Sequence, residues 1–590
     1  MHNSNKGIAV SPGVAVGTAY CIAQVFASRS AKPLSDQEAR DQLVRYEDAR
    51  QKSAAELRAL RRKVETQVGK DEGAIFAAHE AILQDPAFTE RVVQWITRDR
   101  LSAQAALARL LDHYTDIFSK HEDSYLRERL ADIRDVVIRL SGHLSEVLSP
   151  NQSSLPGPLI VVTDELVPSQ AVMLGDVEVK GIVTQRGSQT SHAAIVARSR
   201  GIPAVSGVPR VLEQVKTGDR IIVDGREGHV IVNPDSETLS AYLKLEREFF
   251  DLKDHLAENR HQPAVTADGT PLTLLANING LADAKAAVAM GAAGVGLYRT
   301  EYLYLTHPDV PDEEEQLRVY TDILQALPGK TVTIRTLDIG GDKTVPYLGR
   351  AHHEANPFMG WRSIRLSFEH PEFFATQIRA ILRAAVEAER TGGEVRLLFP
   401  MITTLEEMRS VRALVLRAAR RLEREGKPHA QVPIGMMLEV PAAAIALDDI
   451  IEAVDFVSIG SNDLVQYLMA ADRDNPKVSH LCQPLSPPVL RVLDHTLQVC
   501  RHHQIPVTLC GEMAGQPRAF VILLGMGLRQ FSMSPAFVPT LKELAHLISV
   551  DQAQAIWYHA QKLKTATAVR QYLSEQMAAL APDLSLLDTA

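Results

Sequence analysis

The chain has 590 residues, 45% of them hydrophobic, and a formal net charge of −9 at neutral pH. This length exceeds what a single hydrophobic core serves, so we expect two to four domains. The acidic balance gives no electrostatic footprint for nucleic acid or an anionic membrane surface. The four cysteines have no CxxC or metal-type spacing, and neither a signal-peptide pattern nor a bilayer-spanning apolar stretch occurs. A cytoplasmic protein without disulfides is therefore expected.

Short strand-like runs with glycine turns lie on both sides of a long helical stretch in the first part of the chain. The stretch begins where Ser35 and Glu38 have the spacing of a capping box. This pattern predicts a small α/β domain formed by residues 1–33 and 149–235, with an all-helical bundle, residues 34–148, inserted into it.

A charged amphipathic segment, residues 236–258, predicts one helix that serves as a linker through about residue 260. Eight strand-like runs then alternate with helical stretches: LTLLANI, AGVGLY, TVTIRT, VRLLFP, VPIGMML, DFVSIG, IPVTLC and RQFSMS. This alternation predicts a (β/α)8 TIM barrel over residues 261–590, and the whole chain is a multidomain α/β protein.

Polar residues follow several of these runs, at the strand ends where barrel enzymes carry their chemistry. They are Arg299, Arg335, Glu439, Asn462, Asp463 and Cys510, with Arg473 a short distance further on. Taken singly, each has an ordinary interpretation as a surface salt bridge, a helix cap or a small buried hydrophobe. Taken together they suit a small anion with phosphate and carboxylate groups, because guanidinium groups match both. The pair Glu439 and Asp463 is what Mg²⁺ commonly takes from a protein.

A second candidate is His192, in the run GSQTSHAAIVAR that joins a strand-like segment to a helix. Near a helix N-terminus, backbone N–H groups favour an anion and would stabilise a phosphorylated imidazole. Neutral imidazole is also a nucleophile near neutral pH. A lone histidine at such a place is nevertheless more often a capping or packing residue.

Several long strings then identify a resemblance over essentially the whole chain: SPGVAVG, TSHAAIVAR, GVGLYRTEYLY, RTLDIGGDK, NPFMGWRSIR, MMLEVPAA, SIGSNDLVQY, DRDNP, LCGEMAG and LLGMGLRQFSMS. With these strings the sequence resembles Enzyme I of the phosphoenolpyruvate-dependent sugar phosphotransferase system. The resemblance implies a phosphoenolpyruvate-protein phosphotransferase at the first step of a sugar-uptake phosphorelay, and a homodimer held by its barrel. It also implies that the helical insertion docks the phosphocarrier HPr or a paralogue.

The resemblance also implies the roles of individual residues. His192 would be the phosphohistidine, bonded through Nε2, and Cys510 the proton donor to the enolate carbon. Glu439 and Asp463 would hold Mg²⁺. The residues that would hold phosphoenolpyruvate are Arg299, Arg335, Asn462, Asp463 and Arg473.

One departure concerns the loop before Thr190, where the family usually has an acidic residue and a Gly-Gly pair. This chain has Gln185 to Gln189, QRGSQ, which puts the loop backbone and the preferred carrier in question.

A second enzyme class with a similar histidine and barrel is pyruvate phosphate dikinase or phosphoenolpyruvate synthase. Those enzymes need an ATP-binding domain, whereas the region before His192 is mostly helical and lacks a phosphate-gripping glycine loop. The non-enzyme alternative is a scaffold with an inactive barrel, but every expected site residue is present.

Overall fold

The computed structural model describes most of the chain, and its contacts divide it into two units, Met1–Glu248 and Phe249–Asp588. The described residues are 3–22, 34–67, 76, 79–118, 124–145, 158–164, 179–187, 197, 201–305, 310–340, 356–473, 475, 477–582 and 584. The predicted His192 lies outside them.

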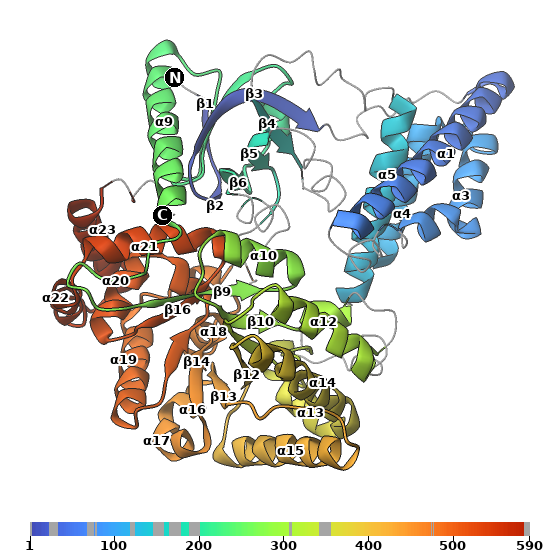
Figure 1. The fold of residues 1–590 in the computed structure, drawn as a ribbon. Helices are drawn as coiled ribbons and strands as arrows, with labels where there is room; N and C mark the ends of the chain where they lie inside the picture. Colours follow the sequence, from blue (N-terminus) through green and yellow to red (C-terminus); the bar gives the residue numbers. More distant parts are fainter. Residues whose placement is uncertain are drawn as a thin grey trace. The chain divides into compact units, whose positions relative to one another are not determined.

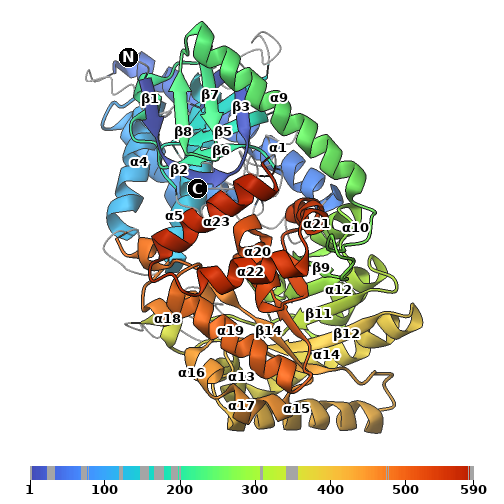
Figure 2. The same cartoon turned by 90° about the vertical axis from the view of Figure 1, so that its left-hand side faces the viewer.

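The first unit contains an eight-stranded mixed sheet in the order β1-β8-β7-β3-β4-β5-β6-β2. Figure 2 shows β1, β8, β7 and β3 of this sheet, and the N-terminal half of helix α9 (Ser236–Asn259) packs against β3, β7 and β8. Its elements are β1 (Asn3–Lys6), β2 (Ile8–Ser11), β3 (Val14–Ile22), β4 (Leu159–Thr163), β5 (Val179–Thr184), β6 (Ala204–Ser206), α8 (Val211–Gln214), β7 (Arg220–Asp224) and β8 (His229–Val232).

A helical insertion separates β3 from β4 in the sequence, although the two strands pair directly in parallel, with Thr18 opposite Leu159. The first helix starts at the predicted capping box, where the Ser35 N–H donates to Glu38 Oε2 at 2.8 Å and the Glu38 N–H donates to Ser35 Oγ at 3.4 Å. The insertion has its own buried core, which includes Phe88. Its helices are α1 (Asp36–Gln67), α3 (Pro86–Thr97), α4 (Ala103–Phe118) and α5 (Ser124–Ser145).

Helix α9 (Ser236–Asn259) forms where the charged amphipathic segment predicts a helix. Its N-terminal half packs Leu239, Tyr242 and Leu243 against the sheet of the first unit. The Glu246 carboxylate accepts the Val16 N–H at 2.9 Å, which ties the helix to β3.

The second unit is a closed parallel barrel in which all eight predicted strand runs form strands. Figure 1 shows strands of this unit with helices around them. Each strand pairs with its sequence neighbour, and β16 closes the ring against β9. The strands are β9 (Thr273–Ile278), β10 (Val295–Arg299), β11 (Thr331–Arg335), β12 (Glu394–Phe399), β13 (Ile434–Leu438), β14 (Phe456–Ile459), β15 (Val507–Leu509) and β16 (Gln530–Met533). The predicted fold class is therefore confirmed.

Helices cover the outside of this barrel, and some start at full capping boxes, such as Thr404 with Glu407. Among the described residues, no helix has both the length and the apolar character needed to cross a membrane. The helices are α10 (Leu281–Ala289), α11 (Glu301–Leu305), α12 (Glu313–Gln325), α13 (Ile364–Glu369), α14 (Pro371–Arg390), α15 (Leu405–Arg424), α16 (Pro441–Ile445), α17 (Leu447–Ile450), α18 (Ser461–Met469), α19 (Pro487–His502), α20 (Pro517–Met526), α21 (Val538–Leu547), α22 (Val550–Ala560) and α23 (Ala566–Leu580). Single-turn 3-10 helices are η4 (Pro357–Met359), η5 (Ile451–Ala453), η6 (Ser479–Leu481), η7 (Glu512–Gly515) and η8 (Pro535–Phe537).

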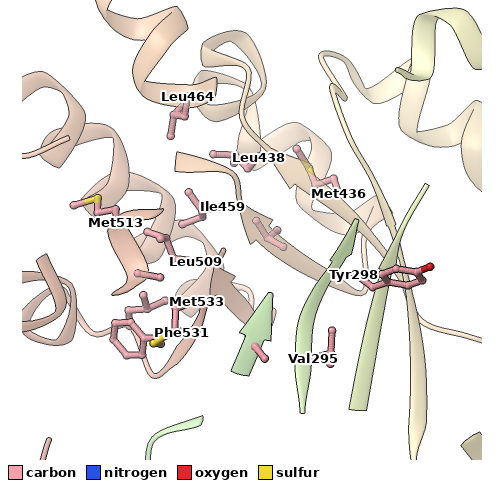
Figure 3. Packing of buried hydrophobic residues seen from close by; sticks show 14 of the residues in the cluster. Val295, Tyr298, Met436, Leu438, Ile459, Leu464, Leu509, Met513, Phe531 and Met533 are labelled. Carbon is pink, nitrogen blue, oxygen red and sulfur yellow. The ribbon is translucent and has the colours of Figure 1, made fainter. Parts of the chain in front are cut away.

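Two apolar layers follow from the alternation of side chains along the barrel strands. Met436 and Leu438 belong to the large core beneath the helices, part of which is drawn in Figure 3. Met437, between them, belongs to a separate buried cluster with Leu297, Leu398, Phe456 and Cys510. Because the side-chain period is two, the residue two positions beyond Met437 also faces inward, at the mouth of the barrel. That residue is Glu439.

Candidate active site

Two of the predicted arginines are the last residues of adjacent strands. Arg299 ends β10, Arg335 ends β11, and the two are direct register partners, so their side chains leave the same face of the barrel wall. Arg335 also pairs with Leu398, a member of the inner cluster. Both guanidinium groups are thus directed to the inner side of the barrel at the carboxyl ends of the strands.

The two predicted carboxylates lie within electrostatic reach of each other. Glu439 follows β13 and is buried, and its Oε1 accepts the Met401 N–H at 2.7 Å. Burial, followed by the negative charges of Asp463 and Asp338, raises the pKa of Glu439 well above its ordinary value. The sequence-predicted pair is therefore assembled, and it carries like charges in a buried place.

Asn462 and Arg473 lie next to this pair. The Asn462 side-chain oxygen accepts the Glu512 N–H at 3.0 Å, which fixes the orientation of the amide. Arg473 Nη1 lies 3.2 Å from Asp463 Oδ1. Arg473, in the loop after α18, thus pairs with Asp463, which lies in the first turn of that helix.

Three further residues complete the charged cluster, and sequence reasoning assigns them no role. Glu301 Oε1 lies 2.6 Å from Arg335 Nη2, and Asp338 Oδ2 lies 3.2 Å from Arg335 Nη1. Arg362 Nη2 donates to both oxygens of Asp338 at 2.9 Å and lies 3.6 Å from Asp463 Oδ2. Glu301 and Asp338 come just after strand ends, a position that could have indicated them.

Among the residues that the structure describes, the cluster has as many arginines as carboxylates. Although burial disfavours its charge, Glu301 and Asp338 raise the pKa of Arg335, so the guanidinium stays protonated. Its four arginines are Arg299, Arg335, Arg362 and Arg473, and its four carboxylates are Glu301, Asp338, Glu439 and Asp463. Such paired charges are held in fixed directions before any ligand binds.

Cys510 follows β15 and belongs to the inner apolar cluster. Its Sγ accepts a hydrogen bond from Ser458 Oγ at 3.2 Å and donates to the Ile459 carbonyl at 3.5 Å. Burial raises the pKa of the Cys510 thiol. A thiol in this place keeps its proton at neutral pH and can act as an acid.

The predicted nucleophile, His192, lies outside the described residues, and its role stays a prediction. The structure describes the start of the atypical loop after β5. Gln185 Nε2 donates to Asp164 Oδ1 at 3.1 Å, and Arg186 Nε lies 3.3 Å from the same oxygen. The loop thus begins with two side chains held by one carboxylate after β4.

No metal-binding group of three or more His, Cys, Asp or Glu side chains occurs in the part of the chain that the structure describes. Glu439 and Asp463 therefore stay a predicted pair of ligands. Two carboxylates are enough for magnesium, because it keeps several waters and usually takes only one or two carboxylates from a protein.

The closed barrel and its charged mouth define the chain as a (β/α)8-barrel enzyme. Its sequence matches three family models: "PEP-utilising enzyme, PEP-binding domain" over residues 253–550, "PEP-utilising enzyme, N-terminal" over 6–129 and "PEP-utilising enzyme, mobile domain" over 155–228.

Relatives named phosphoenolpyruvate-protein phosphotransferase match nearly end to end. The one from Bacillus sp. (strain S) is 41% identical over 550 residues, covering 93% of this chain and 94% of the relative. The one from Bacillus subtilis (strain 168) is 38% identical over 571 residues, covering 97% and 99%. A solution structure of Enzyme I (nEIt) is 33% identical, with a TM-score of 0.33, and covers 42% of this chain and 99% of that one. The chain belongs to the phosphoenolpyruvate-protein phosphotransferase family. The resemblance seen in the sequence, and the class of transferase it implies, are confirmed.

Proposed function

We propose that this chain takes the phosphoryl group of phosphoenolpyruvate onto His192 and passes it to a histidine of the carrier HPr or a paralogue, at the first step of a sugar-uptake phosphorelay. The names of its relatives support phosphoenolpyruvate as the phosphoryl donor. The observation that carries the proposal is the buried mouth of the barrel, where paired arginines and carboxylates lie close to the protonated thiol of Cys510.

Phosphoenolpyruvate carries a phosphate and a carboxylate, and guanidinium groups bind both with two parallel hydrogen bonds. Arg299 and Arg335 leave the same face of adjacent strands, which supports their binding one small anion together. Arg473 and the amide of Asn462 supply further donors, and Asp463 contacts substrate as well as metal.

Mg²⁺ fits the pair Glu439 and Asp463, because burial and the like charges of Asp463 and Asp338 raise the pKa of Glu439. A bound cation would relieve that repulsion and would neutralise charge on the phosphoryl oxygens. Phosphoenolpyruvate adds negative charge beside these carboxylates, which is a further reason to expect a cation.

The residues of the chain carry the bond changes. The Nε2 lone pair of His192 forms the N–P bond while the P–O bond of phosphoenolpyruvate breaks, leaving its electron pair on an enolate oxygen. The enolate π electrons then take the proton of Cys510, the S–H electron pair stays on sulfur, and the C–O group becomes the carbonyl of pyruvate.

The remaining parts of the proposal concern organisation. Residues 1–33 with 149–235 form the phosphohistidine domain, 34–148 the HPr-docking domain, 236–260 the linker and 261–590 the domain that binds phosphoenolpyruvate and dimerises. The contact boundary at Glu248 and Phe249 lies within the linker segment, which supports a division there. A cytoplasmic protein is in keeping with this pathway.

The test is incubation of the purified chain with Mg²⁺ and phosphoryl-labelled phosphoenolpyruvate, without nucleotide. Acid-labile label that appears on the wild type, is absent from His192→Ala and moves to added HPr supports the proposal. Label that requires ATP would assign the chain to the dikinase class instead. No label under either condition would favour the scaffold.

A further inference from the structure

We propose that Ser458 is a positioning residue for the reaction: its hydroxyl holds the Cys510 sulfur and stabilises the thiolate that remains after proton transfer. This inference rests on the proposed function, in which Cys510 protonates the enolate. It assigns a role to a serine in the barrel interior that does not itself touch the substrate.

The geometry comes from two neighbouring strands. Ser458 lies on β14 and is 1% exposed, and Cys510 directly follows β15 and is 2% exposed. The Ser458 Oγ–H donates to Cys510 Sγ at 3.2 Å, and the thiol donates to the Ile459 carbonyl at 3.5 Å. In the resting state the sulfur therefore has one donor and one acceptor.

Apart from these two contacts, the sulfur packs among apolar side chains, and the charges of Arg335, Arg299 and Glu439 act on it from further away. Cys510 shares its buried cluster with Leu297, Leu398, Met437 and Phe456. Among the described residues, the hydrogen bonds of the sulfur go to Ser458 and Ile459. Because Cys510 is buried, water does not solvate a thiolate formed here, so a hydrogen-bond donor in direct contact with the sulfur contributes strongly to its free energy, in addition to the nearby charges.

When the thiol loses its proton, the contact with the Ile459 carbonyl becomes unfavourable and the hydrogen bond from Ser458 becomes stronger. The thiolate has no S–H to offer the Ile459 carbonyl, whose partial negative charge then faces an anion. The Ser458 O–H keeps its proton and becomes a donor to a charged acceptor, a stronger bond than one to a neutral thiol. Its stabilisation is therefore larger after proton transfer than before, which is the condition for accelerating a step.

A matched control lies at the same level of the barrel. Thr508 on β15 is the direct register partner of Ser458, and its hydroxyl donates to Gln530 Oε1 at 3.0 Å. Thr508→Val removes a hydroxyl from the neighbouring position and leaves the sulfur contacts in place. Ser458→Thr keeps the hydroxyl on β14 and serves as the rescue variant.

The experiment follows proton transfer and phosphoryl transfer separately in the full-length chain. Wild type and variants are equilibrated in D₂O with Mg²⁺, phosphoenolpyruvate and pyruvate, and proton NMR records deuterium entering the methylene carbon of phosphoenolpyruvate. Parallel samples record the rate at which label from phosphoenolpyruvate reaches His192. We expect Ser458→Ala to slow deuterium entry by about 10- to 100-fold, the range for a hydrogen bond to a charged group, with labelling much less affected. Ser458→Thr restores most of the exchange, and Thr508→Val exchanges like the wild type.

Two results would overturn the inference: deuterium entry in Ser458→Ala at the wild-type rate, or a parallel loss of labelling and exchange that marks general damage to the site. If the wild type itself takes no label from phosphoenolpyruvate, the proposed function fails and the inference falls with it. These failures are distinguishable because labelling is measured in every sample.

Discussion

Removing one partner of the buried ion pair of Asp338 and Arg362 should destabilise the barrel far more than removing one partner of an exposed pair of similar length. Both oxygens of Asp338 accept from Arg362 Nη2 at 2.9 Å, and each side chain is at most 6% exposed. Asp338→Ala leaves a buried guanidinium with Asp463 at 3.6 Å as its nearest carboxylate. Removing one partner of such a pair costs about 3–5 kcal/mol, because the other charge stays buried. The matched control is Arg412→Ala, which breaks an exposed pair with Asp455 at 3.2 Å and should cost about 0–1 kcal/mol.

Urea unfolding of the full chain measures both costs. The chain has three tryptophans, and a Trp95→Phe background leaves Trp361 and Trp557, both in the barrel, as fluorescent reporters. We expect a clear fall in the barrel midpoint for Asp338→Ala and almost none for Arg412→Ala, with similar m-values. Equal midpoints for the two variants would refute the claim that burial decides how much stability is lost when one partner of an ion pair is removed.

Three other predictions concern acid stability, proton transfer and substrate binding. Although burial raises it, hydrogen bonds from two arginines and Lys427 lower the pKa of Glu313 from 4.5 to about 2. The carboxylate thus stabilises the fold above the unfolded-state value and loses that contribution as pH falls from 4.5 toward about 2, so thermal unfolding of Glu313→Gln should depend less on pH in this window. Cys510→Ala should retain acid-labile labelling and slow pyruvate formation, measured by stopped-flow coupling to lactate dehydrogenase; equal slowing of both steps would count against the proton-donor role. Arg335→Lys should raise the KM for phosphoenolpyruvate by about 10-fold or more, because an ammonium cannot reproduce the two-pronged guanidinium contact; an unchanged KM would place Arg335 outside the substrate site.

The barrel and its ring of polar residues could be predicted because both depend on short-range patterns. Buried parallel strands are continuous apolar runs, and the residue that ends each run is fixed by the chain itself. Arg299, Arg335, Glu439 and Cys510 therefore lie where the runs end, as the sequence predicts. The start of α1 was equally predictable, because the capping box of Ser35 and Glu38 is a local interaction.

The charged partners could not be predicted in the same way. Arg362 meets Asp338 across 24 residues of chain, and no periodic pattern links the two positions. The Met401 N–H that binds Glu439 depends on a left-handed backbone, with a φ of 56°, which is uncommon for a residue other than glycine. In the sequence, Ser458 is one small polar residue in an apolar strand, and nothing nearby indicates a partner. Its hydroxyl meets the Cys510 sulfur because the two strands are neighbours in the barrel.

Mass-spectrometric mapping of the phosphoryl group tests the link between the barrel and His192 most directly. The chain is incubated with phosphoenolpyruvate and Mg²⁺ without nucleotide, kept at alkaline pH to preserve phosphohistidine, and digested. We predict one phosphoryl group on His192 in the wild type and none in His192→Ala, with a strongly reduced yield in Arg335→Ala. A phosphoryl group on another residue, or full modification of Arg335→Ala, would contradict the transfer of phosphoryl from the barrel mouth to His192.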